Sequence, residues 1–489
     1  MHAPSELYRP SLALLTDLYQ LTMAYGYWKS GMRQREAVFH LFFRQHPFRG
    51  GFTIACGLEY VVDWLTRFRF ADDDLAYLAT LRGDDGEVLF EPAFFDYLRT
   101  VTFSGDLDAV PEGTVVFPNE PLIRVSGPLI QGQLFETALL NIVNFQTLIA
   151  TKAARVCLAA RGDPVVEFGL RRAQGIDGAL AASRAAYVGG CAATSSVLAG
   201  RTFGIPVRGT HAHSWVMAFD DELSSFQAYA EAMPNNCVFL VDTYDTLGGV
   251  RRAIEVGQWL RSRGHELAGI RLDSGDLAYL SIAARKLLDG AGFHRSLIVA
   301  SNDLDEHLIA SLKEQGAVIG VWGVGTKLVT AFDQPALGGV YKLAAIRSPG
   351  EAWSYRLKLS EQSIKISTPG RLQVRRFSAG GECVGDMIYD EQLGVNGEAT
   401  LVDPRDANRR KKIAVGTAHD DLLVPVLRQG RLACDQPPLA AIRDRAAVEL
   451  GRFSTGIRRF VNPHEYPVGL EPRLFELKGQ LVRQARGLA

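Results

Sequence analysis

A histidine and a carboxylate follow two consecutive apolar runs in the middle of the chain. His213 comes at the end of one run, and Asp242 comes at the end of the next. A neutral imidazole has one nucleophilic nitrogen, and a hydrogen bond to its other nitrogen orients the ring. Asp242, at the next strand end, is therefore a reasonable partner to orient the ring of His213. A hydrogen-bonded core histidine is the alternative for His213.

Residues that could bind anions follow two of the other apolar runs. Arg171 carries a planar guanidinium that fits a carboxylate or a phosphate, unless it is a solvated surface arginine. Gly323, Gly325 and Thr326 are typical of a phosphate cradle, because glycines let backbone N–H groups approach an anion and a helix N-terminus adds a favourable field. The spacing Gly320-x-x-Gly323-x-Gly325 differs from a dinucleotide-binding fingerprint, which argues against a dehydrogenase.

Six consecutive segments place these residues where strands should end. Each segment is an apolar run that ends in polar residues and precedes a helical pattern, such as 277–288. This alternation predicts βαβ units and a parallel sheet, and ligands bind such sheets at the carboxyl ends of the strands. The polar residues could instead be ordinary helix caps, but six repetitions favour a site. The runs begin at Val165, Val207, Val238, Gly269, Leu297 and Val318.

The order of these patterns predicts an α/β protein with three regions. Residues 1–140 mix helix with short strands and predict an N-terminal α+β domain. Residues 141–347 contain the strand–helix series and predict an α/β barrel with catalytic strand ends. Residues 348–489 predict a C-terminal extension with short strands and a largely helical end. We expect this extension to return in part to the first domain; the alternative is a domain of its own.

Composition excludes several classes of protein. The 489 residues are 47% hydrophobic, enough for a large core, and the formal net charge of −1 gives no basic footprint for nucleic acid. No apolar run reaches the length of about 18 residues that spans a membrane, and no signal peptide is evident. The six cysteines lack CxxC spacing, which argues against zinc and against a disulfide framework. We therefore expect a cytoplasmic protein without nucleic-acid or membrane partners.

Five motifs, in order along most of the chain, resemble those of the nicotinate phosphoribosyltransferase family. They are TDLYQLTM (16–23), EFGLRRAQG (167–175), GTHAHS (209–214), RLDSGD (271–276) and GVGTK (323–327). The resemblance implies an N-terminal domain packed on an irregular α/β barrel, and a homodimer with shared active sites. It implies that nicotinate and phosphoribosyl pyrophosphate give nicotinate mononucleotide and pyrophosphate, with ATP hydrolysis coupled to the reaction.

The resemblance also implies roles for aromatic and polar residues. Phe168 and Tyr19 of the partner subunit would sandwich the pyridine ring; the alternative is that both are core aromatics. Thr210 would contact the nicotinate carboxylate, or is simply a residue with high strand propensity. Asp273 would accept both ribose hydroxyls, with Arg271 nearby for pyrophosphate. Two further residues would line the ribose or its phosphate, or cap the next helix: Ser301 and Asn302.

Two more implications concern ATP and the choice of substrate. In the family, the histidine that corresponds to His213 is phosphorylated by ATP, which implies a nucleophilic role for His213. The family motif varies at His211, so we expect His211 to be structural. The resemblance also implies Mg²⁺ that binds through the substrate phosphates rather than in a dedicated protein site. Ser195 stands where related nicotinamide enzymes carry Asp, which would accept from an amide but repel a carboxylate. Ser195 therefore predicts nicotinate as substrate, unless it is only a helix N-terminal residue. The preceding Cys191-Ala192-Ala193 departs from the family pattern.

Two alternatives to a nicotinate phosphoribosyltransferase remain: an enzyme that prefers nicotinamide, and a non-catalytic metabolite-binding protein with the same fold.

Overall fold

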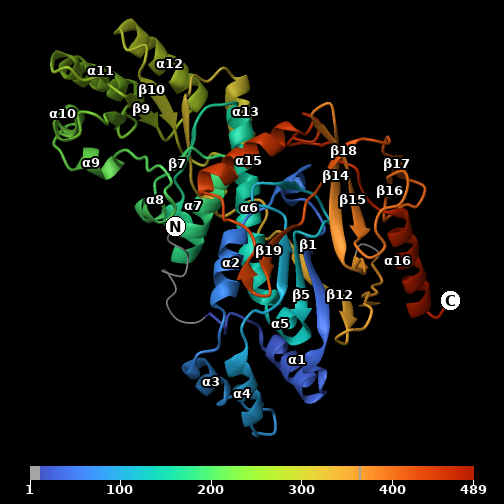
Figure 1. Cartoon of the computed structure of the whole chain (residues 1–489). Coiled ribbons are helices and arrows are strands. Elements are labelled where there is room, and N and C mark those ends of the chain that lie inside the picture. The colour runs from blue at the N-terminus through green and yellow to red at the C-terminus, as the bar shows by residue number, and fades with distance from the viewer. Residues whose placement is uncertain (1–11, 363–364, 489) are drawn as a thin grey trace. The chain divides into compact units, whose positions relative to one another are not determined.

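The computed structural model describes residues 12–362 and 365–488 and divides into two compact units. The first unit combines Met1–Leu148 with Ala336–Ala489, and the second unit is Ile149–Pro335. The long helix α6 (Glu136–Ala160) begins in the first unit and ends in the second (Figure 1). The prediction that no signal peptide is present rests mainly on residues 1–11, which lie outside the described residues.

The second unit contains a six-stranded sheet in which every paired strand is parallel. Its strands are β6 (Val165–Glu167), β7 (Ala193–Thr194), β8 (Val238–Leu240), β9 (Gly269–Leu272), β10 (Leu297–Ala300) and β11 (Val321–Val324). Its helices are α7 (Gly175–Val188), α8 (Val197–Phe203), α9 (His213–Met217), α10 (Glu222–Ala232), α11 (Thr246–Ser262), α12 (Leu277–Gly290), α13 (Glu306–Glu314) and α14 (Thr326–Val329). These elements run from green to yellow in Figure 1. The predicted α/β class with a parallel sheet is confirmed.

The strand order is β7-β6-β11-β10-β9-β8. The first strand in the sequence, β6, therefore pairs with the last one, β11. An isolated parallel bridge from Thr194 to Val207 extends the β7 edge. Among the described residues no ladder joins the Val207 segment to β8, so a hydrogen-bonded closed barrel is not shown. The apolar run at Val207 therefore forms a bridge rather than a strand, in keeping with the weak strand propensity of Pro206 and Gly209 on either side.

Acidic and hydroxyl residues begin several helices of the second unit. The side chain of Asp276 accepts from the Tyr279 N–H at 3.0 Å and caps α12. Asp245 and Asp305 cap α11 and α13 in the same way, each accepting from the backbone N–H three residues later. Such bonds satisfy amide donors that have no partner inside the helix. The caps come later in each loop than Asp242, Asp273 and Ser301, so those three residues remain available for other contacts.

The first unit is built on two larger sheets. A seven-stranded sheet has the order β13-β12-β1-β5-β3-β19-β20, and all its paired strands are antiparallel. These strands are β1 (Glu36–Phe43), β3 (Asp106–Ala109), β5 (Ile123–Pro128), β12 (Gly339–Arg347), β13 (Ser354–Tyr355), β19 (Val424–Arg428) and β20 (Arg431–Leu432). Four of them come from residues after 335, so the late part of the chain completes a sheet begun by the early part. Phe39 of β1 stacks on Tyr341 of β12 with ring centroids 4.9 Å apart in the buried core.

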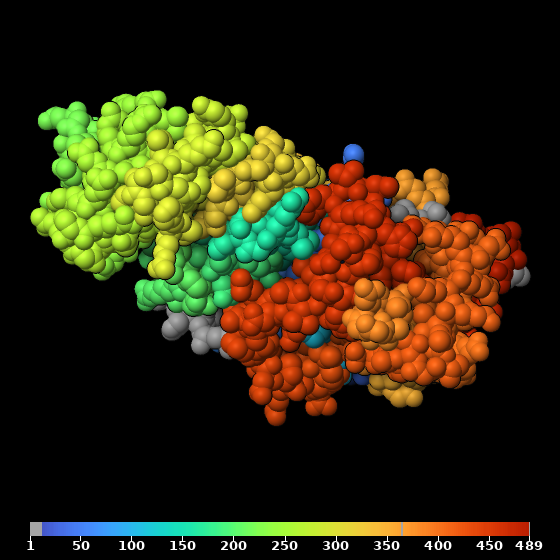
Figure 2. Space-filling model, turned by 90° about the horizontal axis from the view of Figure 1, so that it is seen from above, coloured from blue at the N-terminus to red at the C-terminus, as the bar shows by residue number. Residues whose placement is uncertain are grey.

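The second sheet of this unit has six strands from the late part of the chain, in the order β17-β16-β21-β15-β14-β18. They are β14 (Leu372–Ala379), β15 (Glu382–Asp390), β16 (Thr400–Val402), β17 (Arg410–Lys412), β18 (Ala418–Asp421) and β21 (Val468–Leu470). A short pair joins β2 (Thr53–Ile54) to β4 (Val115–Val116). Segments of this late part, in orange and red, form much of the surface seen in Figure 2.

Helices complete the first unit. They are α1 (Leu18–Lys29), α2 (Leu58–Arg67), α3 (Asp72–Leu78), α4 (Pro92–Thr100), α5 (Leu129–Leu134), α15 (Leu439–Gly451) and α16 (Pro472–Ala485). None of the helices in the described ranges is long and apolar enough to cross a membrane. None of the six cysteines, all of which lie within those ranges, forms a disulfide.

Candidate active site

Several residues predicted for chemistry lie at one edge of the parallel sheet. Phe168 follows β6 directly, Asp273 follows β9, and Ser301 follows β10. Asp242 comes two residues after β8. Because all these strands are parallel, their carboxyl ends lie at the same edge, and the loops that leave them can share contacts. We call this edge of the second unit the rim.

Asp273 is the residue through which most of these loops meet. Its Oδ1 accepts a hydrogen bond from the Ser301 hydroxyl and lies 3.5 Å from Nη2 of Arg271. Its Oδ2 lies 3.8 Å from Nε2 of His213. The Asp273 side chain is 29% exposed and that of His213 is 40% exposed. Both side chains are therefore accessible and lie close enough together to contact the same ligand.

Asp242 contacts the backbone of the next strand end rather than His213. Its Oδ2 accepts from the Asp273 N–H at 2.9 Å and from the Ser274 hydroxyl at 2.6 Å. The ring of His213 is held instead by Thr243, whose Oγ1 is 3.1 Å from Nδ1. The pairing of His213 with Asp242 that we predicted is thus not the contact observed. Thr243 directly follows Asp242, so the predicted partner of His213 was wrong by one position in the sequence.

The other carboxylate oxygen of Asp242 has an unusual environment. Asp242 Oδ1 is buried and has no hydrogen-bond partner among the described residues. A carboxylate oxygen without a partner carries an unfavourable desolvation cost. A ligand that brings positive charge or a donor would remove this cost, so Asp242 is a good candidate for binding a cation or a water molecule.

Arg271 links three loops of the rim. Its Nε donates to the Ser301 hydroxyl at 2.9 Å, and its Nη1 donates to the Thr210 hydroxyl at 2.8 Å. The guanidinium carbon lies 5.9 Å from the centre of the Phe168 ring. The side chain is only 12% exposed. A charged guanidinium held in this way is preorganised for an anion, because its geometry is set before the anion arrives.

Phe168 packs against a glycine of the neighbouring strand. A Cβ atom added to Gly323 would lie 2.6 Å from two carbons of the Phe168 ring. Gly325 is also close, since a Cβ there would lie 3.2 Å from the Phe168 carbonyl oxygen. The GVG motif therefore makes room for Phe168 in this structure. The phosphate cradle that we predicted for Gly323, Gly325 and Thr326 stays a prediction, and the cradle would lie beside this ring.

A buried glutamate, which the sequence analysis did not single out, anchors the loop that carries Phe168. Glu167 accepts hydrogen bonds from the Ser183 hydroxyl at 2.8 Å, from the Thr194 hydroxyl at 2.6 Å, and from the Gly169 N–H. A buried carboxylate with several donors holds its loop in one conformation. The only sequence signal was a charged residue at the end of an apolar strand. Thr243 was missed as well, although it is a hydroxyl residue directly beside a predicted site carboxylate.

Ser195 and Asn302 do not cap the helices that follow them. Ser196 caps α8, because its hydroxyl accepts from the Ala199 N–H at 3.3 Å, and Ser195 comes one residue earlier. Asp305 caps α13, while Asn302 has a φ of 99°, a left-handed conformation that asparagine tolerates better than most residues. Ser301 and Asn302 therefore do not cap the helix that follows them, whereas Ser195 lies beside the N-terminus of α8 and its role in choosing the substrate stays a prediction.

Burial and local structure bear on four further residues of the sequence analysis. Burial lowers the pKa of His211 to about 4, and its Nε2 accepts from the Leu240 N–H at 3.2 Å, so this histidine is neutral and structural. His213 begins the short helix α9 rather than ending a strand. Tyr19, in the first unit, is 48% exposed and so is not a core aromatic. Arg171 is exposed, and no hydrogen bond or ion pair within the described ranges involves it.

Comparisons with known proteins agree with this arrangement. The model of the nicotinate phosphoribosyltransferase (NAPRTase) family matches residues 164–356. Models of the N-terminal and C-terminal domains of nicotinate phosphoribosyltransferase match residues 14–144 and 372–478. The three matches cover most of the chain and leave only short segments between them.

Individual relatives are similar over nearly their whole length. The nicotinate phosphoribosyltransferase of Bacillus subtilis is 45% identical over 97% of this chain and 96% of its own length. The crystal structure of human nicotinic acid phosphoribosyltransferase superimposes with a TM-score of 0.84 and 35% identity, over 95% of this chain and 99% of the human chain. A nicotinate-nucleotide pyrophosphorylase from Pyrococcus furiosus shares the fold, with a TM-score of 0.68 and 21% identity over 90% of this chain and 95% of its own. Since the family model, the relatives and the rim agree, the chain belongs to the nicotinate phosphoribosyltransferase family.

Proposed function

We propose that this chain joins nicotinate to phosphoribosyl pyrophosphate, forming nicotinate mononucleotide and pyrophosphate, and couples the reaction to ATP hydrolysis through a phosphohistidine at His213. The names of the full-length relatives support the nicotinate reaction. The observation that carries the proposal is the convergence on Asp273, where Arg271, Ser301 and His213 gather at one rim. In this cluster Arg271 supplies a cation that can bind phosphate, Asp273 a carboxylate that can accept from ribose hydroxyls, and His213 an imidazole.

The reaction needs positioning more than it needs a base. The pyridine nitrogen is already nucleophilic at neutral pH, so the site must hold the ring in line with the anomeric carbon. In this proposal one face of the ring stacks on Phe168 and the other on Tyr19 of the partner subunit, which adds about 0.5 to 1.5 kcal/mol beyond area burial. The Thr210 hydroxyl and the Arg171 guanidinium bind the carboxylate, since both are able to donate to it.

The departing pyrophosphate needs positive charge and backbone donors. Arg271 stabilises the developing negative charge, and its anchoring at Ser301 and Thr210 avoids a reorganisation cost during the reaction. The N–H groups near Gly325 and Thr326 bind the same phosphates. Asp273 accepts the ribose hydroxyls. Ser301 and its neighbour Asn302 line the ribose phosphate.

His213 carries the coupling to ATP. Its Nε2 attacks the terminal phosphorus of ATP, a nitrogen–phosphorus bond forms, and ADP leaves; water later releases phosphate. The phosphorylated ring faces Asp273, so the added charge changes how tightly the pyrophosphate substrate and product are held. Asp242 fits the Mg²⁺ that the substrate phosphates require, because its buried Oδ1 has no other partner. When bound, Mg²⁺ neutralises part of the phosphate charge.

Ser195 selects the acid over the amide in this proposal. A serine at this place leaves no negative charge against the nicotinate carboxylate, whereas an aspartate would repel it. We further propose a homodimer, because Tyr19 lies outside the unit that contains the rim. A cytoplasmic location agrees with six thiols that form no disulfide.

The deciding experiment measures product formation from phosphoribosyl pyrophosphate with nicotinate or nicotinamide, each with and without ATP. ATP-stimulated formation of nicotinate mononucleotide supports the full proposal. Activity with nicotinamide alone would overturn acid selection by Ser195. Equal rates with and without ATP would remove the coupling, and no product with either base would favour a metabolite-binding protein.

A further inference from the structure

One buried carboxylate joins the two loops that the proposed reaction assigns to nicotinate. Glu167 is the last residue of β6 and directly precedes Phe168. Its side chain also contacts Thr194, the last residue of β7, which directly precedes Ser195. In the proposed reaction Phe168 stacks on the pyridine ring, and Ser195 chooses between an acid and an amide on that ring. Glu167 therefore lies between the residues that recognise two features of the same small molecule.

On the Phe168 side, the Glu167 carboxylate closes a short turn. Its Oε1 accepts from the Gly169 N–H, so Phe168 stands between two residues that are bonded to each other. The Phe168 N–H donates to the Val324 carbonyl at 2.9 Å. The Ser183 hydroxyl donates to Oε2 of Glu167 at 2.8 Å, so the helix that follows this loop, α7, is tied to the same carboxylate. Together these contacts fix the backbone that carries the Phe168 ring.

On the Ser195 side, the same carboxylate acts through the hydroxyl of Thr194. This hydroxyl donates to Oε2 of Glu167 at 2.6 Å and accepts from the Ser196 N–H at 3.0 Å. The Ser195 N–H itself donates to the backbone carbonyl of Glu167 at 2.9 Å. Ser195 is therefore held through its own N–H and through both of its neighbours, and each of these contacts leads back to Glu167.

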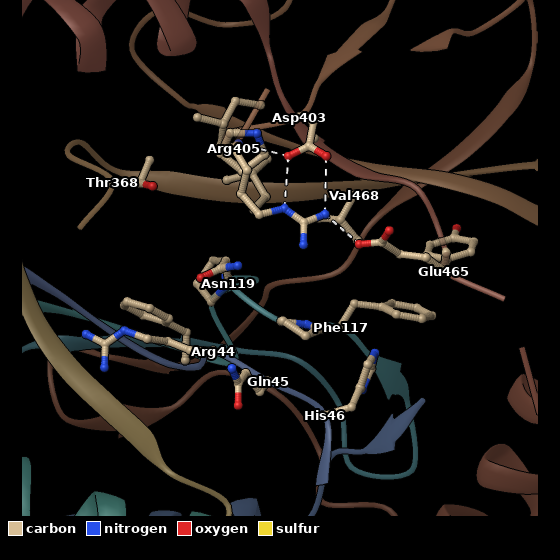
Figure 3. Close-up of a pocket in the computed structure, with 18 of the residues that line it drawn as sticks. Arg44, Gln45, His46, Phe117, Asn119, Thr368, Asp403, Arg405, Glu465 and Val468 are labelled. Carbon is tan, nitrogen blue, oxygen red and sulfur yellow. Dashed lines mark hydrogen bonds and ion pairs between the residues drawn. The ribbon is translucent and has the colours of Figure 1, made fainter. Parts of the chain in front are cut away.

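Burial makes this network firm. The side chains of Glu167, Ser183 and Thr194 are at most 1% exposed, so water does not compete for their hydrogen bonds. The ion pair between Arg405 and Glu465 in Figure 3 provides a contrast, because both of these side chains are 59% exposed and solvent weakens their attraction. The contacts of Glu167 can therefore fix the position of one loop relative to the other.

We propose that Glu167 is a positioning residue for nicotinate: its carboxylate sets the place of Ser195 relative to the Phe168 ring, and so links stacking of the pyridine to the choice of its substituent. The inference rests on the proposed function, in which Phe168 and Ser195 bind nicotinate. Because Glu167 is buried, it acts through those two residues rather than on the substrate. Arg271 and Asp273 lie on and beside β9, so binding of phosphoribosyl pyrophosphate should not depend on Glu167.

The first test compares Thr194→Val with the wild type by steady-state kinetics of the full-length protein. Valine has the shape of threonine but cannot donate to Glu167 or accept from the Ser196 N–H. We expect kcat/KM for nicotinate to fall about 10-fold or more, because a small misplacement of a reactant is costly. KM for phosphoribosyl pyrophosphate should stay the same, since its ligands belong to other strands. Thr194→Ser keeps the hydroxyl and should restore kcat/KM.

A double-mutant cycle with Ser195→Asp measures the link between the two loops directly. An aspartate in a firmly held loop cannot move away from the nicotinate carboxylate, whereas an aspartate in a loosened loop can. The loss of preference for nicotinate over nicotinamide that Ser195→Asp causes should therefore be smaller in the Thr194→Val background, by about 3-fold or more. A loss of the same size in both backgrounds, or no loss in either, would overturn the link.

Ser281→Ala is the matched control for the loss of a buried hydroxyl in the same unit. Ser281 is fully buried, and its hydroxyl donates to the Ala278 carbonyl at 3.0 Å and accepts from the Val318 N–H at 3.1 Å. Ser281→Ala should lower stability and leave kcat/KM for nicotinate unchanged. An equal fall in kcat/KM in Ser281→Ala and Thr194→Val would reduce the role of the network to stability and overturn the proposal.

Glu167→Gln provides a second, independent variant. Glutamine keeps the shape of the side chain but replaces one acceptor oxygen with a donor, so it cannot accept from both the Gly169 N–H and the Thr194 hydroxyl. It should lower kcat/KM for nicotinate and spare KM for phosphoribosyl pyrophosphate, as Thr194→Val does. A wild type that forms no nucleotide would overturn the proposed function and this inference with it. An active wild type whose kcat/KM is unchanged in both variants would overturn this inference alone.

Discussion

Thr243 Oγ1 lies 3.1 Å from Nδ1 of His213, while Nε2 of the same ring faces Asp273 at 3.8 Å. The two nitrogens therefore have different partners. If Nδ1 carries the proton and donates it to Thr243, Nε2 keeps the lone pair that attacks phosphorus. Thr243 is in this sense a positioning residue, since it acts through His213.

Thr243→Val should slow phosphorylation of His213 by ATP about 2- to 10-fold, because Nδ1 loses a neutral hydrogen bond worth about 0.5 to 1.5 kcal/mol. Thr243→Ser retains the hydroxyl and should restore the rate. The measurement is the rate of phosphoenzyme formation as a function of pH, which reports the protonation of the imidazole. A serine variant as slow as the valine variant would show that packing, rather than the hydrogen bond, is what matters.

His213→Ala should abolish the phosphoenzyme and the stimulation by ATP, while slow synthesis without ATP remains. The reason is that the rim keeps Phe168, Arg271 and Asp273, which position the substrates. Acid-labile phosphate on the protein and product formation with and without ATP are the two measurements. His294→Ala is the control, because the His294 side chain is 71% exposed and, within the part of the chain that the structure describes, its ring forms a hydrogen bond or ion pair with Asp289 alone. Persistent ATP stimulation in His213→Ala would exclude this histidine from the coupling.

Ser195→Asp should disfavour nicotinate, because an added carboxylate repels the carboxylate of the substrate. The ratio of kcat/KM for nicotinate to that for nicotinamide should fall by about 10-fold or more, the size of one unfavourable charge contact of about 1.4 kcal/mol. Ser195→Asn provides a neutral side chain of the same shape as the control. If the aspartate and asparagine variants show the same ratio, acid selection lies elsewhere.

Gly323→Ala should displace the Phe168 ring, since the new Cβ would lie 2.6 Å from two of its carbons. We expect KM for nicotinate to rise, together with a loss of about 1 to 3 kcal/mol of stability from overpacking. Gly320→Ala is a matched control three residues earlier, where the new Cβ would meet only Leu297 Cδ2 at an ordinary 3.5 Å. Steady-state kinetics and denaturant unfolding test the pair; an unchanged KM in Gly323→Ala would separate Phe168 from nicotinate binding.

Glu306→Gln should lower the free energy of unfolding by about 3 to 5 kcal/mol, because the change removes the buried carboxylate that compensates two buried cations. Glu306 lies 2.7 Å from Lys152 Nζ and 2.7 Å from Arg155 Nε, and all three side chains are at most 1% exposed. Glu314→Gln breaks an exposed ion pair with Arg161 and should cost at most about 1 kcal/mol. Denaturant unfolding of the wild type and of both variants measures the two losses; equal losses in the two variants would contradict the prediction.

The same cluster predicts a loss of stability in acid. Burial by itself would raise the pKa of Glu306, but Lys152 and Arg155 outweigh burial and lower it below 4.5. A carboxylate whose pKa is lower in the folded state stabilises the fold above its unfolded pKa, and this contribution is lost as the pH falls through the folded value. The wild type should therefore lose stability below about pH 4.5, and Glu306→Gln should lose less over that range.

Local patterns along the chain predicted the parallel sheet of the second unit. Apolar runs near Val165, Val238, Gly269 and Leu297 became β6, β8, β9 and β10, because strand and helix periodicity are short-range properties of a chain. The helix expected at 277–288 is α12. The run at Val207 was the exception, since Pro206 and Gly209 weaken strand pairing and only a bridge remains.

Other features depend on residues far apart in sequence. The late strands β12, β13, β19 and β20 join a sheet begun by β1, which the sequence left open between two alternatives. The sequence could also not predict that Thr243, rather than Asp242, contacts His213.

The sequence by itself thus determined the fold class, the family and the set of polar residues at the strand ends. Only the tertiary structure decided which of those residues touch. The physical reason is that periodicity and motifs act over a few residues, whereas strand order and side-chain contacts arise from packing between segments that lie far apart along the chain.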